Sequence, residues 1–490
     1  MSQPQFNDPA LVREHAFING EWVQASSKRC FAVHDPASGD VIGSCPELST
    51  EEVQDAIRSA SEAQEVFKSS DTRMRATMLQ NWARLMRESK ADLAQLLTWE
   101  NGKPLVEARG EIEYAASFLE WFAGEAMRSY GDFIQPSNPT NRAVTLRQPV
   151  GVCALITPWN FPAAMVTRKA GPAIAAGCAV VLKAPAETHL SALALAELSL
   201  RAGVPKGVFS VVTALENTVD IGHVLTSSPL IQKVSFTGST RVGKLLMSQS
   251  SSTLKKLSME LGGLAPFIVF EDADIESAVD GAISCKFRGS GQTCVCANIF
   301  LVHKQVYDVF AAKFVHRVKG FRVGNGFDAA TTHGPLIHNK AVARVEDQVK
   351  DAREQGGRVV LGGNPLPELG RNFYAPTVIL DAHAGMKFTQ DETFGPVAGL
   401  IPFSTEEEAI AIANRADVGL AGYFFSKDVK RCWRVAEKLA VGMVGVNTGM
   451  ISDPSTPFGG IKQSGFGREG SKYGLDEYTT IKTVTFSIGA

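Results

Sequence analysis

The sequence predicts an α/β protein built from two doubly wound parallel sheets. The first observation is a run of alternating elements between Pro149 and Gln249, in which short β-branched segments are followed by segments with helical spacing. The second is that the alternation resumes after about residue 260 and continues to a helix expected from Lys427. Repeated βα units of this kind build parallel sheets, whose ligands bind at the carboxyl ends of the strands. We therefore expect two α/β units.

Each unit is expected to alternate strands and helices in order. Strands are predicted from short β-branched runs, and helices from apolar spacings of three and four. In the first unit the expected strands are 150–156, 179–183, 207–212 and 233–236, and the expected helices are 165–176, 191–203, a polar segment before 233 and a segment from Ser239. In the second unit the expected strands are 266–270, 298–303, 359–363 and 422–426, and the expected helices start from Asp274, Lys304, Thr405 and Lys427.

The remaining segments have simpler patterns. Residues 50–68, 73–97 and 103–130 show apolar spacings of three and four, which predicts helices that pack on the first sheet. Residues 145–149 and 478–485 are β-like and flank the sheets. Exposed strand edges commonly pair with another subunit, so we expect a small β arm for oligomerisation.

Composition limits the possible partners. Lys and Arg total 49 against 51 Asp and Glu, a net charge of -2, so no cationic field is available to hold nucleic acid or an anionic bilayer. The longest apolar stretch, 173–182, is too short to span a membrane, and the N-terminus resembles neither a signal nor a transit peptide. The 8 cysteines are scattered without metal-ligand spacing. These features predict a cytoplasmic protein that acts on small molecules and holds no metal.

Three residues are candidates for a catalytic role. Cys294 lies in the loop-like segment GSGQTCVCAN, where a thiol is accessible, but no His base accompanies it. Glu260 is a lone acid in the apolar segment LSMELGGLAP, where burial would raise its pKa and make it a general base, although a capping or paired acid is equally consistent. Asn160 lies between two prolines in ITPWNFP, where its amide could donate to an oxyanion or simply form a turn.

A glycine-containing turn, FTGSTRVG at 236–243, joins an expected strand to an expected helix. Glycine lets the backbone approach a phosphate, and the helix N-terminus offers free N–H groups to an anion. The turn therefore suits a dinucleotide pyrophosphate, although such turns often serve only tight packing.

Together, several motifs resemble those of the NAD(P)-dependent aldehyde dehydrogenase superfamily. In chain order they are TPWNFP, FTGSTRVG, MELGG, GQTC, ETFGPV and PFGGIKQSGFGREG, and they span nearly the whole chain. The stretches TRKAGPAIAAGC, KFRGSGQTCVCAN and GFGREGSKYGLDEY resemble the succinate-semialdehyde dehydrogenases within it. The resemblance implies an aldehyde dehydrogenase-like fold that forms a homodimer or homotetramer. Its implied parts are an NAD(P)-binding domain of residues 1–128 and 150–259, a catalytic domain of residues 260–460, and an oligomerisation arm of residues 129–149 and 474–490.

The resemblance also implies a mechanism. The Cys294 thiolate adds to an aldehyde, and the Asn160 amide and the Cys294 backbone N–H hold the oxyanion. Hydride leaves to the nicotinamide, and Glu260 activates the water that hydrolyses the resulting thioester. Lys169 corresponds to a lysine that relays protons with this glutamate in relatives, although it could equally lie on a helix surface. Oxidation of Cys294 to a disulfide with Cys296 would be a reversible off-switch, but the small strained ring favours Cys296 as a passive neighbour.

A cofactor site follows from the same resemblance. It comprises Trp159 and Lys183 at the adenosine ribose and diphosphate, Gly238 and Ser239 at the pyrophosphate, Leu261 near the nicotinamide, and Glu392 with Phe394 at the nicotinamide ribose. Many relatives have a glutamate where this chain has Ala186. That glutamate would bond a 2′-hydroxyl and repel a 2′-phosphate, whereas Ala186 does neither, and Glu187 could restore the exclusion. We therefore expect use of both NADP and NAD, with a weak preference for NADP.

Substrate choice is assigned by the resemblance to Arg168, Arg288 and Ser452. Two guanidiniums can grip a distal carboxylate by bidentate hydrogen bonds, although a single Arg is more often structural. We expect succinate semialdehyde as the substrate. Glutarate semialdehyde is longer by one methylene, a difference worth about 1–3 kcal/mol, so it stays a competitor.

Two further classes stay open. A thiol esterase or acyltransferase would use Cys294 without a nucleotide, and strict NAD(P) dependence with an aldehyde would exclude it. A non-catalytic structural relative would keep the fold, but it has little reason to keep the whole catalytic set.

Overall fold

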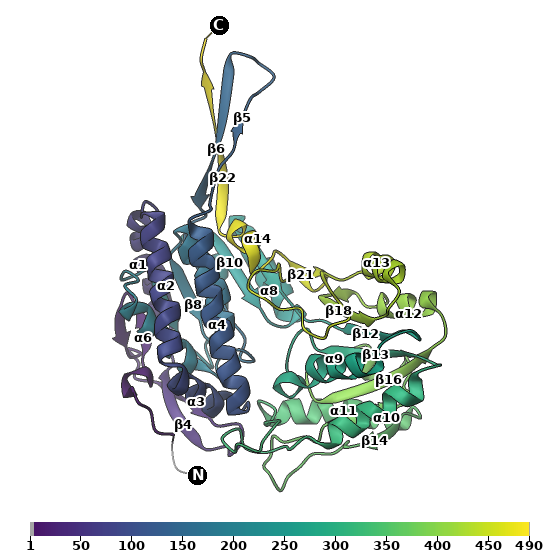
Figure 1. Cartoon of the computed structure of the whole chain (residues 1–490). Helices are drawn as coiled ribbons and strands as arrows, with labels where there is room; N and C mark the ends of the chain where they lie inside the picture. The colour runs from purple at the N-terminus through teal and green to yellow at the C-terminus, as the bar shows by residue number, and fades with distance from the viewer. Residues whose placement is uncertain (1–3, 490) are drawn as a thin grey trace.

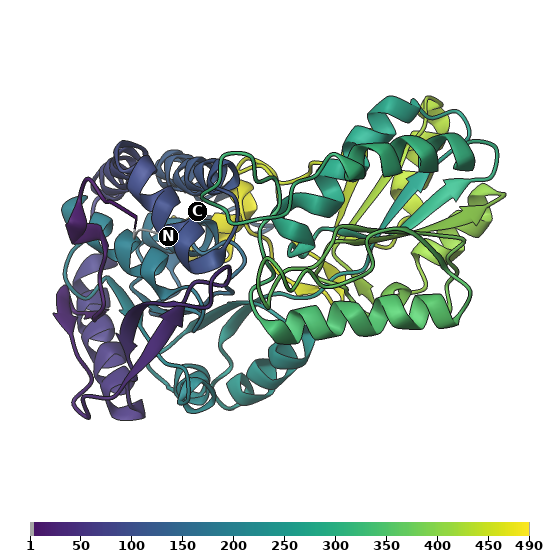
Figure 2. The ribbon, with the colours of Figure 1, turned by 90° about the horizontal axis from the view of Figure 1, so that it is seen from below.

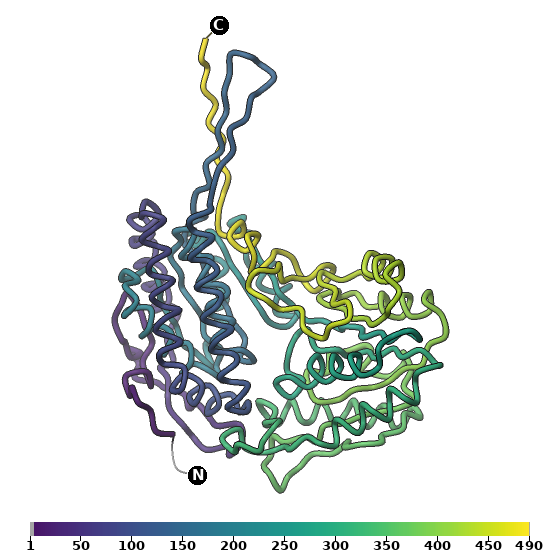
Figure 3. Tube along the Cα trace, in the orientation of Figure 1, coloured from purple at the N-terminus to yellow at the C-terminus, as the bar shows by residue number. Residues whose placement is uncertain are grey.

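The computed structural model describes residues 4–489 and has two α/β lobes and a projecting β arm (Figure 1; Figure 3). Residues 1–3 and 490, which our domain boundaries include, lie outside the described part. The first lobe contains an eight-stranded sheet in the order β2-β1-β9-β8-β7-β10-β11-β21. Its strands are β1 (Ala16–Ile18), β2 (Glu21–Val23), β7 (Cys153–Ile156), β8 (Val180–Lys183), β9 (Phe209–Val212), β10 (Lys233–Thr237), β11 (Lys256–Glu260) and β21 (Gly465–Phe466). The strands from β9 to β11 are parallel, and those at both edges are antiparallel.

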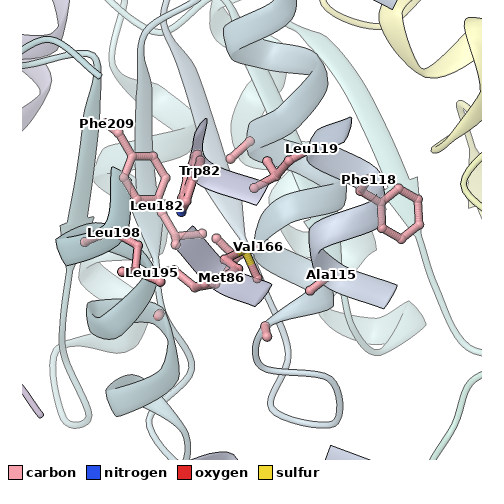
Figure 4. Close-up of a cluster of buried hydrophobic side chains, with 14 of the residues drawn as sticks. Trp82, Met86, Ala115, Phe118, Leu119, Val166, Leu182, Leu195, Leu198 and Phe209 are labelled. Carbon is pink, nitrogen blue, oxygen red and sulfur yellow. The ribbon is translucent and has the colours of Figure 1, made fainter. Parts of the chain in front are cut away.

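Helices cover both faces of this sheet. One face carries α5 (Ala164–Ala176) and α6 (His189–Arg201), with α2 (Thr72–Glu88), α3 (Lys90–Asn101) and α4 (Leu105–Ala126) packed outside them, and the other carries α1 (Thr50–Phe67), α7 (Thr218–Ser227) and α8 (Thr240–Ser250). Successive residues of a strand face opposite sides of the sheet. Leu182 therefore packs with Trp82 and Phe209 in the core on one face (Figure 4), whereas Val181 packs with α1 in the core on the other face. The lobe is therefore doubly wound, as predicted.

The second lobe lies beside the first in the view from below (Figure 2). Its seven-stranded sheet has the order β14-β15-β16-β13-β12-β18-β19 and is parallel except for β14. The strands are β12 (Ala265–Val269), β13 (Ala297–His303), β14 (Arg358–Leu361), β15 (Thr377–Leu380), β16 (Val397–Phe403), β18 (Ala421–Phe425) and β19 (Met443–Val446). One face carries α9 (Ile275–Phe287) and α10 (Tyr307–Lys319), and the other carries α11 (Asn339–Glu354), α12 (Glu406–Ala413) and α13 (Val429–Lys438). The predicted α/β class is confirmed.

A three-stranded arm projects from the first lobe (Figure 1). It consists of β5 (Phe133–Ile134), β6 (Asn141–Pro149) and β22 (Thr479–Ser487), so the two β-like segments of the sequence pair with each other. Its exposed apolar residues are Phe133, Ile134, Leu146, Ile481 and Phe486. An exposed apolar surface of this kind is typical of an interface with another chain.

Several elements differ from the sequence prediction. The helix expected over 73–97 is two helices, α2 and α3, which are separated at Ser89 although the apolar spacing continues across the break. The strand expected over 359–363 is an antiparallel edge strand. Sequence patterns missed β11 and α11, since both are rich in polar residues.

The smaller elements were not predicted either. They are β3 (Cys30–His34), β4 (Val41–Pro46), β17 (Val418–Gly419), β20 (Ile461–Lys462) and α14 (Ser471–Asp476). The strands β1, β2, β5, β15, β16, β19 and β21 were not predicted either, although β15, β16 and β19 are apolar. Across residues 4–489, no helix is long and apolar enough to cross a membrane.

Candidate active site

A cavity of about 400 Å³ lies where residues of the two lobes meet, at the carboxyl ends of β10 and β11. Its lining includes nine of the predicted site residues: Trp159, Asn160, Gly238, Ser239, Glu260, Leu261, Cys294, Glu392 and Phe394. Four further lining residues, His338, Lys340, Ala341 and Arg344, belong to α11 and the residue before it. Sequence reasoning missed these four because it predicted no helix there.

Cys294 is presented by a tightly folded loop. Gly289–Gly291, in the preceding turn, have φ values of 57°, 56° and 79°, in the left-handed region that favours glycine. A Cβ on Gly291 would lie 2.2 Å from the carbonyl oxygen of Gly395, so only glycine permits this close approach. Burial, and then the nearby Glu392 carboxylate, raise the pKa of the Cys294 thiol to about 12. The resting thiol is therefore protonated and must lose a proton before it can attack.

Glu260 ends β11 beside Thr237, the last residue of β10. Its side chain is only 3% exposed, and neither carboxylate oxygen has a hydrogen-bond partner among the described residues. Burial, and then repulsion by Glu469, raise its pKa well above the usual range, against the opposing pull of Arg168 and Lys169. A capping or paired structural acid would have a partner here. The geometry favours a general base instead.

The loop that carries Asn160 is fixed by a buried ion pair. Lys103 Nζ donates to the Asn160 carbonyl oxygen at 2.9 Å and pairs with Glu111 at 2.5 Å. The other Glu111 oxygen accepts from the Ala163 N–H at 2.9 Å, which secures the approach to α5. The Asn160 amide in turn donates to the Gln292 carbonyl at 2.9 Å, so it faces the loop of the candidate nucleophile. Sequence reasoning missed this pair because its two residues carry no recognisable motif.

Glu469 joins two of the predicted residues. Lys169 is fully buried, donates to Ser235 Oγ at 3.0 Å and forms an ion pair with Glu469. The helix-surface alternative for Lys169 is therefore wrong. Arg168 Nε lies 2.6 Å from the other Glu469 oxygen, and its side chain is 3% exposed. Glu469 supplies a counter-ion for the buried guanidinium, whereas Arg168 Nη2 has no hydrogen-bond partner among the described residues, so the expected role of Arg168 at a substrate carboxylate stays a prediction.

Arg288 and Ser452 do come together. They line a cavity of about 360 Å³, in which the Arg288 guanidinium lies 4.7 Å from the centre of the Phe161 ring. A small adjoining cavity is lined by the same two residues and by Thr293 and Val295, the neighbours of the thiol in the chain. The two predicted residues therefore border the loop of the candidate nucleophile.

The main cavity fits a dinucleotide. Gly238 follows β10, and Ser239 caps the N-terminus of α8, which directs its free N–H groups toward this turn. Glu392 Oε1 is buried without a partner among the described residues, and burial raises the Glu392 pKa to about 7. The rings of Trp159 and Phe394 meet edge to face at 5.6 Å. The lining thus offers an anion site, an unpaired acceptor for a hydroxyl and an aromatic wall.

Lys183 and Ala186 do not line the main cavity. Lys183 Nζ donates to the Ala214 carbonyl oxygen at 3.3 Å, and burial lowers its pKa to about 8. Ala186 lines a separate cavity of about 330 Å³ together with Glu187 and Arg371. The position beside Ala186 is therefore open and has charges of both signs nearby.

Cys296 is 3% exposed, and its N–H donates to the Thr293 carbonyl at 2.9 Å. It forms no disulfide with Cys294 in this structure. Within residues 4–489, no group of three or more His, Cys, Asp or Glu side chains is placed to hold a metal ion.

Comparison with known proteins identifies relatives over nearly the whole chain. The profile of the aldehyde dehydrogenase family matches residues 22–484. Succinate-semialdehyde dehydrogenase [NADP(+)] 1 of Schizosaccharomyces pombe is 55% identical over 96% of this chain and 95% of its own length. Glutarate-semialdehyde dehydrogenase of Pseudomonas aeruginosa is 51% identical over 98% of each chain. A crystal structure of an E. coli NADP-dependent enzyme superposes with a TM-score of 0.97 at 52% identity, covering 99% of this chain and 100% of the other.

Proposed function

The chain belongs to the aldehyde dehydrogenase family, and we propose that it oxidises succinate semialdehyde to succinate with NADP or NAD. The observation that carries the substrate assignment is the cavity lined by Arg288 and Ser452 beside the Cys294 loop. A guanidinium there suits an aldehyde that carries a carboxylate at its far end. The name of the S. pombe relative supports the same substrate.

A panel of aldehydes with and without a distal carboxylate tests this assignment by the rate of NAD(P)H formation. Succinate semialdehyde should have a much higher kcat/KM than butanal, the neutral aldehyde of equal length. Equal values for the two would contradict the proposal. Ester hydrolysis without nucleotide, and no aldehyde oxidation, would favour a thiol esterase instead.

Glutarate semialdehyde is the second candidate substrate, since the P. aeruginosa relative bears its name at 51% identity. The two semialdehydes differ by one methylene, which typically changes transition-state binding by about 1–3 kcal/mol. The ratio of their kcat/KM values decides between them.

In the proposed mechanism the Cys294 thiol loses its proton to solvent, and its sulfur forms a bond to the aldehyde carbon as the C=O π bond breaks. The Asn160 amide and the Cys294 backbone N–H donate to the oxygen that becomes negative, as they would in an oxyanion hole. The bound dinucleotide supplies a hydride acceptor. Loss of hydride leaves the acyl group on Cys294 as a thioester.

Glu260 then acts as the base for deacylation. It takes a proton from water, whose oxygen bonds to the thioester carbon; the C–S bond breaks, and the Cys294 thiolate leaves. Lys169 and Glu469 lie close enough to influence the Glu260 pKa, so we propose that they pass the proton onward.

Arg288→Ala should raise KM for succinate semialdehyde by about 10- to 100-fold and leave KM for butanal within about twofold. The reason is the loss of a charge-assisted contact with the carboxylate, typically worth about 1.5–3 kcal/mol. Steady-state kinetics with both aldehydes measures the effect. Arg317→Ala, at an exposed arginine paired with Asp280 on the enzyme surface, is the control and should change neither KM. Equal losses for both aldehydes would show that Arg288 is structural.

Glu187→Gln should raise the ratio of kcat/KM for NADP over NAD by about tenfold, equivalent to about 1.4 kcal/mol. Glu187 lines the cavity beside Ala186, so its charge would oppose a 2′-phosphate there. The matched control is Glu216→Gln, at an exposed acid paired with Arg29. An unchanged ratio would remove Glu187 from cofactor choice. A wild-type preference for NAD above roughly a hundredfold, about 2.7 kcal/mol, would contradict dual cofactor use.

We also infer that the exposed arm pairs with a second copy of the chain, which gives a homodimer or homotetramer. The support is its long antiparallel β6–β22 ladder and its exposed apolar side chains, such as Ile481 at 67% exposure. A reducing compartment such as the cytoplasm suits an enzyme that depends on a free thiol.

A further inference from the structure

The cavity that holds Arg288 and Ser452 is also lined by Tyr114 of α4, whose side chain carries a hydroxyl. Its ring packs edge to face against Phe118 at 4.8 Å between centroids. The Tyr114 ring thus packs against the core, while its side chain also lines the cavity of about 360 Å³, to which it contributes a hydroxyl.

One arginine, Arg288, lines this cavity and could bind an anion. Lys103 also lines it, but Lys103 is neutralised by the buried Glu111. Glu107 lines it as well, and its carboxylate accepts from the Gly289 N–H at 3.3 Å, which supports the turn beside Arg288. Among the described residues, Arg288 has no acid within salt-bridge distance, so its guanidinium is free to bind a carboxylate.

Arg168 lies close to Tyr114 but does not line the cavity. Its Nε pairs with Glu469 at 2.6 Å and its guanidinium lies 4.1 Å from the centre of the Phe458 ring, whereas its Nη2 has no hydrogen-bond partner among the described residues. A carboxylate has about four lone-pair sites, of which a bidentate arginine occupies two. The remaining sites need donors that require no counter-ion, and hydroxyl groups meet this requirement.

We propose that the Tyr114 hydroxyl is a donor to the distal carboxylate of the substrate, together with Arg288 and the Ser452 hydroxyl. This assignment rests on the proposed function and adds a specificity-determining residue to it. Both arginines and Ser452 pull the pKa of Tyr114 down, but burial outweighs them and raises it. The hydroxyl therefore keeps its proton near neutral pH and donates.

The test is Tyr114→Phe, which keeps the ring against Phe118 and removes only the hydroxyl. KM for succinate semialdehyde should rise about tenfold or more, the usual effect of losing a hydrogen bond to a charged group, with KM and kcat for butanal unchanged. Tyr130→Phe, at a tyrosine that is 72% exposed, is the control. Succinate should also protect Cys294 from iodoacetamide at a lower concentration in the wild type than in Tyr114→Phe.

The outcomes separate the two proposals. A wild type that prefers succinate semialdehyde over butanal, with the same preference and the same succinate protection in Tyr114→Phe, overturns the role of Tyr114 alone. Equal losses for both aldehydes in Tyr114→Phe show that Tyr114 is structural and also overturn it. A wild type with no preference for the carboxylated aldehyde overturns the proposed function, and the role of Tyr114 with it.

Discussion

Replacing Cys294 with alanine should lower kcat/KM for succinate semialdehyde by at least about 10⁴-fold, in line with the loss of a catalytic nucleophile in other enzymes. Cys294 is the cavity-lining residue whose side chain can both add to an aldehyde and leave from an acyl group. Without the thiol no covalent intermediate forms, and the hydride has no thiohemiacetal from which to leave.

Cofactor affinity separates this effect from misfolding. The Kd for NADPH, measured by protein fluorescence, should stay within about twofold of the wild type in Cys294→Ala, because Gly238, Ser239 and Glu392 are unchanged. The matched control is Cys296→Ala, two residues further along the same loop. Cys296 is 3% exposed and outside the cavity lining, so its variant should retain most of the activity. A loss in Cys296→Ala as large as that in Cys294→Ala would contradict the assignment of the nucleophile.

The fold was predictable where strands and helices alternate with strong apolar patterns. The strands over β7, β8, β9 and β10 were expected within a few residues of their observed bounds. The prediction omitted the apolar strands β15, β16 and β19, and it failed at elements whose burial depends on distant partners. The strand β11 contains Lys256 and Ser258 and gains its place in the sheet through pairing with β10 and β21. The sequence did not reveal the break at Ser89. The apolar spacing continues from α2 into α3 because both helices bury their apolar residues in one common core.

The candidate site was predictable where residues belong to local motifs, as Asn160, Glu260 and Cys294 do. What the sequence did not reveal is which charges pair across the fold. Arg168 and Glu469 are about three hundred residues apart, yet Arg168 Nε lies 2.6 Å from a Glu469 oxygen, an ion pair that no local motif signals. Tyr114 was missed for the same reason, since its helix meets the Arg288 turn only in the folded chain.

Glu260→Gln should convert multiple turnover into a single burst. Acylation of Cys294 does not need the water-activating base, so about one NAD(P)H per subunit should form rapidly. Steady-state turnover should then fall by about 10²- to 10⁴-fold, the usual contribution of a general base. Rapid-mixing measurement of reduced-cofactor fluorescence resolves the two phases. Mass spectrometry of the quenched enzyme should find a succinyl group on the peptide that contains Cys294.

The pH profile of the wild type supplies a second measure of the same role. Burial and the Glu469 carboxylate raise the pKa of Glu260, so its carboxyl loses its proton at a higher pH than an ordinary glutamate does. The rate of deacylation should therefore rise with pH through this raised pKa. Glutamine has no proton to lose, so the same limb should be absent from Glu260→Gln.

Hydroxylamine distinguishes a missing base from a damaged site. It is a stronger nucleophile than water and needs no deprotonation, so when it is added after the burst, once the free aldehyde has been removed, it should cleave the acyl-enzyme of Glu260→Gln and release the hydroxamate and the free Cys294 thiol. A variant without a burst would show that Glu260 is needed before the thioester forms, for instance to take the proton of the Cys294 thiol, whose pKa burial raises to about 12. That result would move Glu260 from deacylation to activation of the nucleophile, because the first chemical step would then depend on its carboxylate.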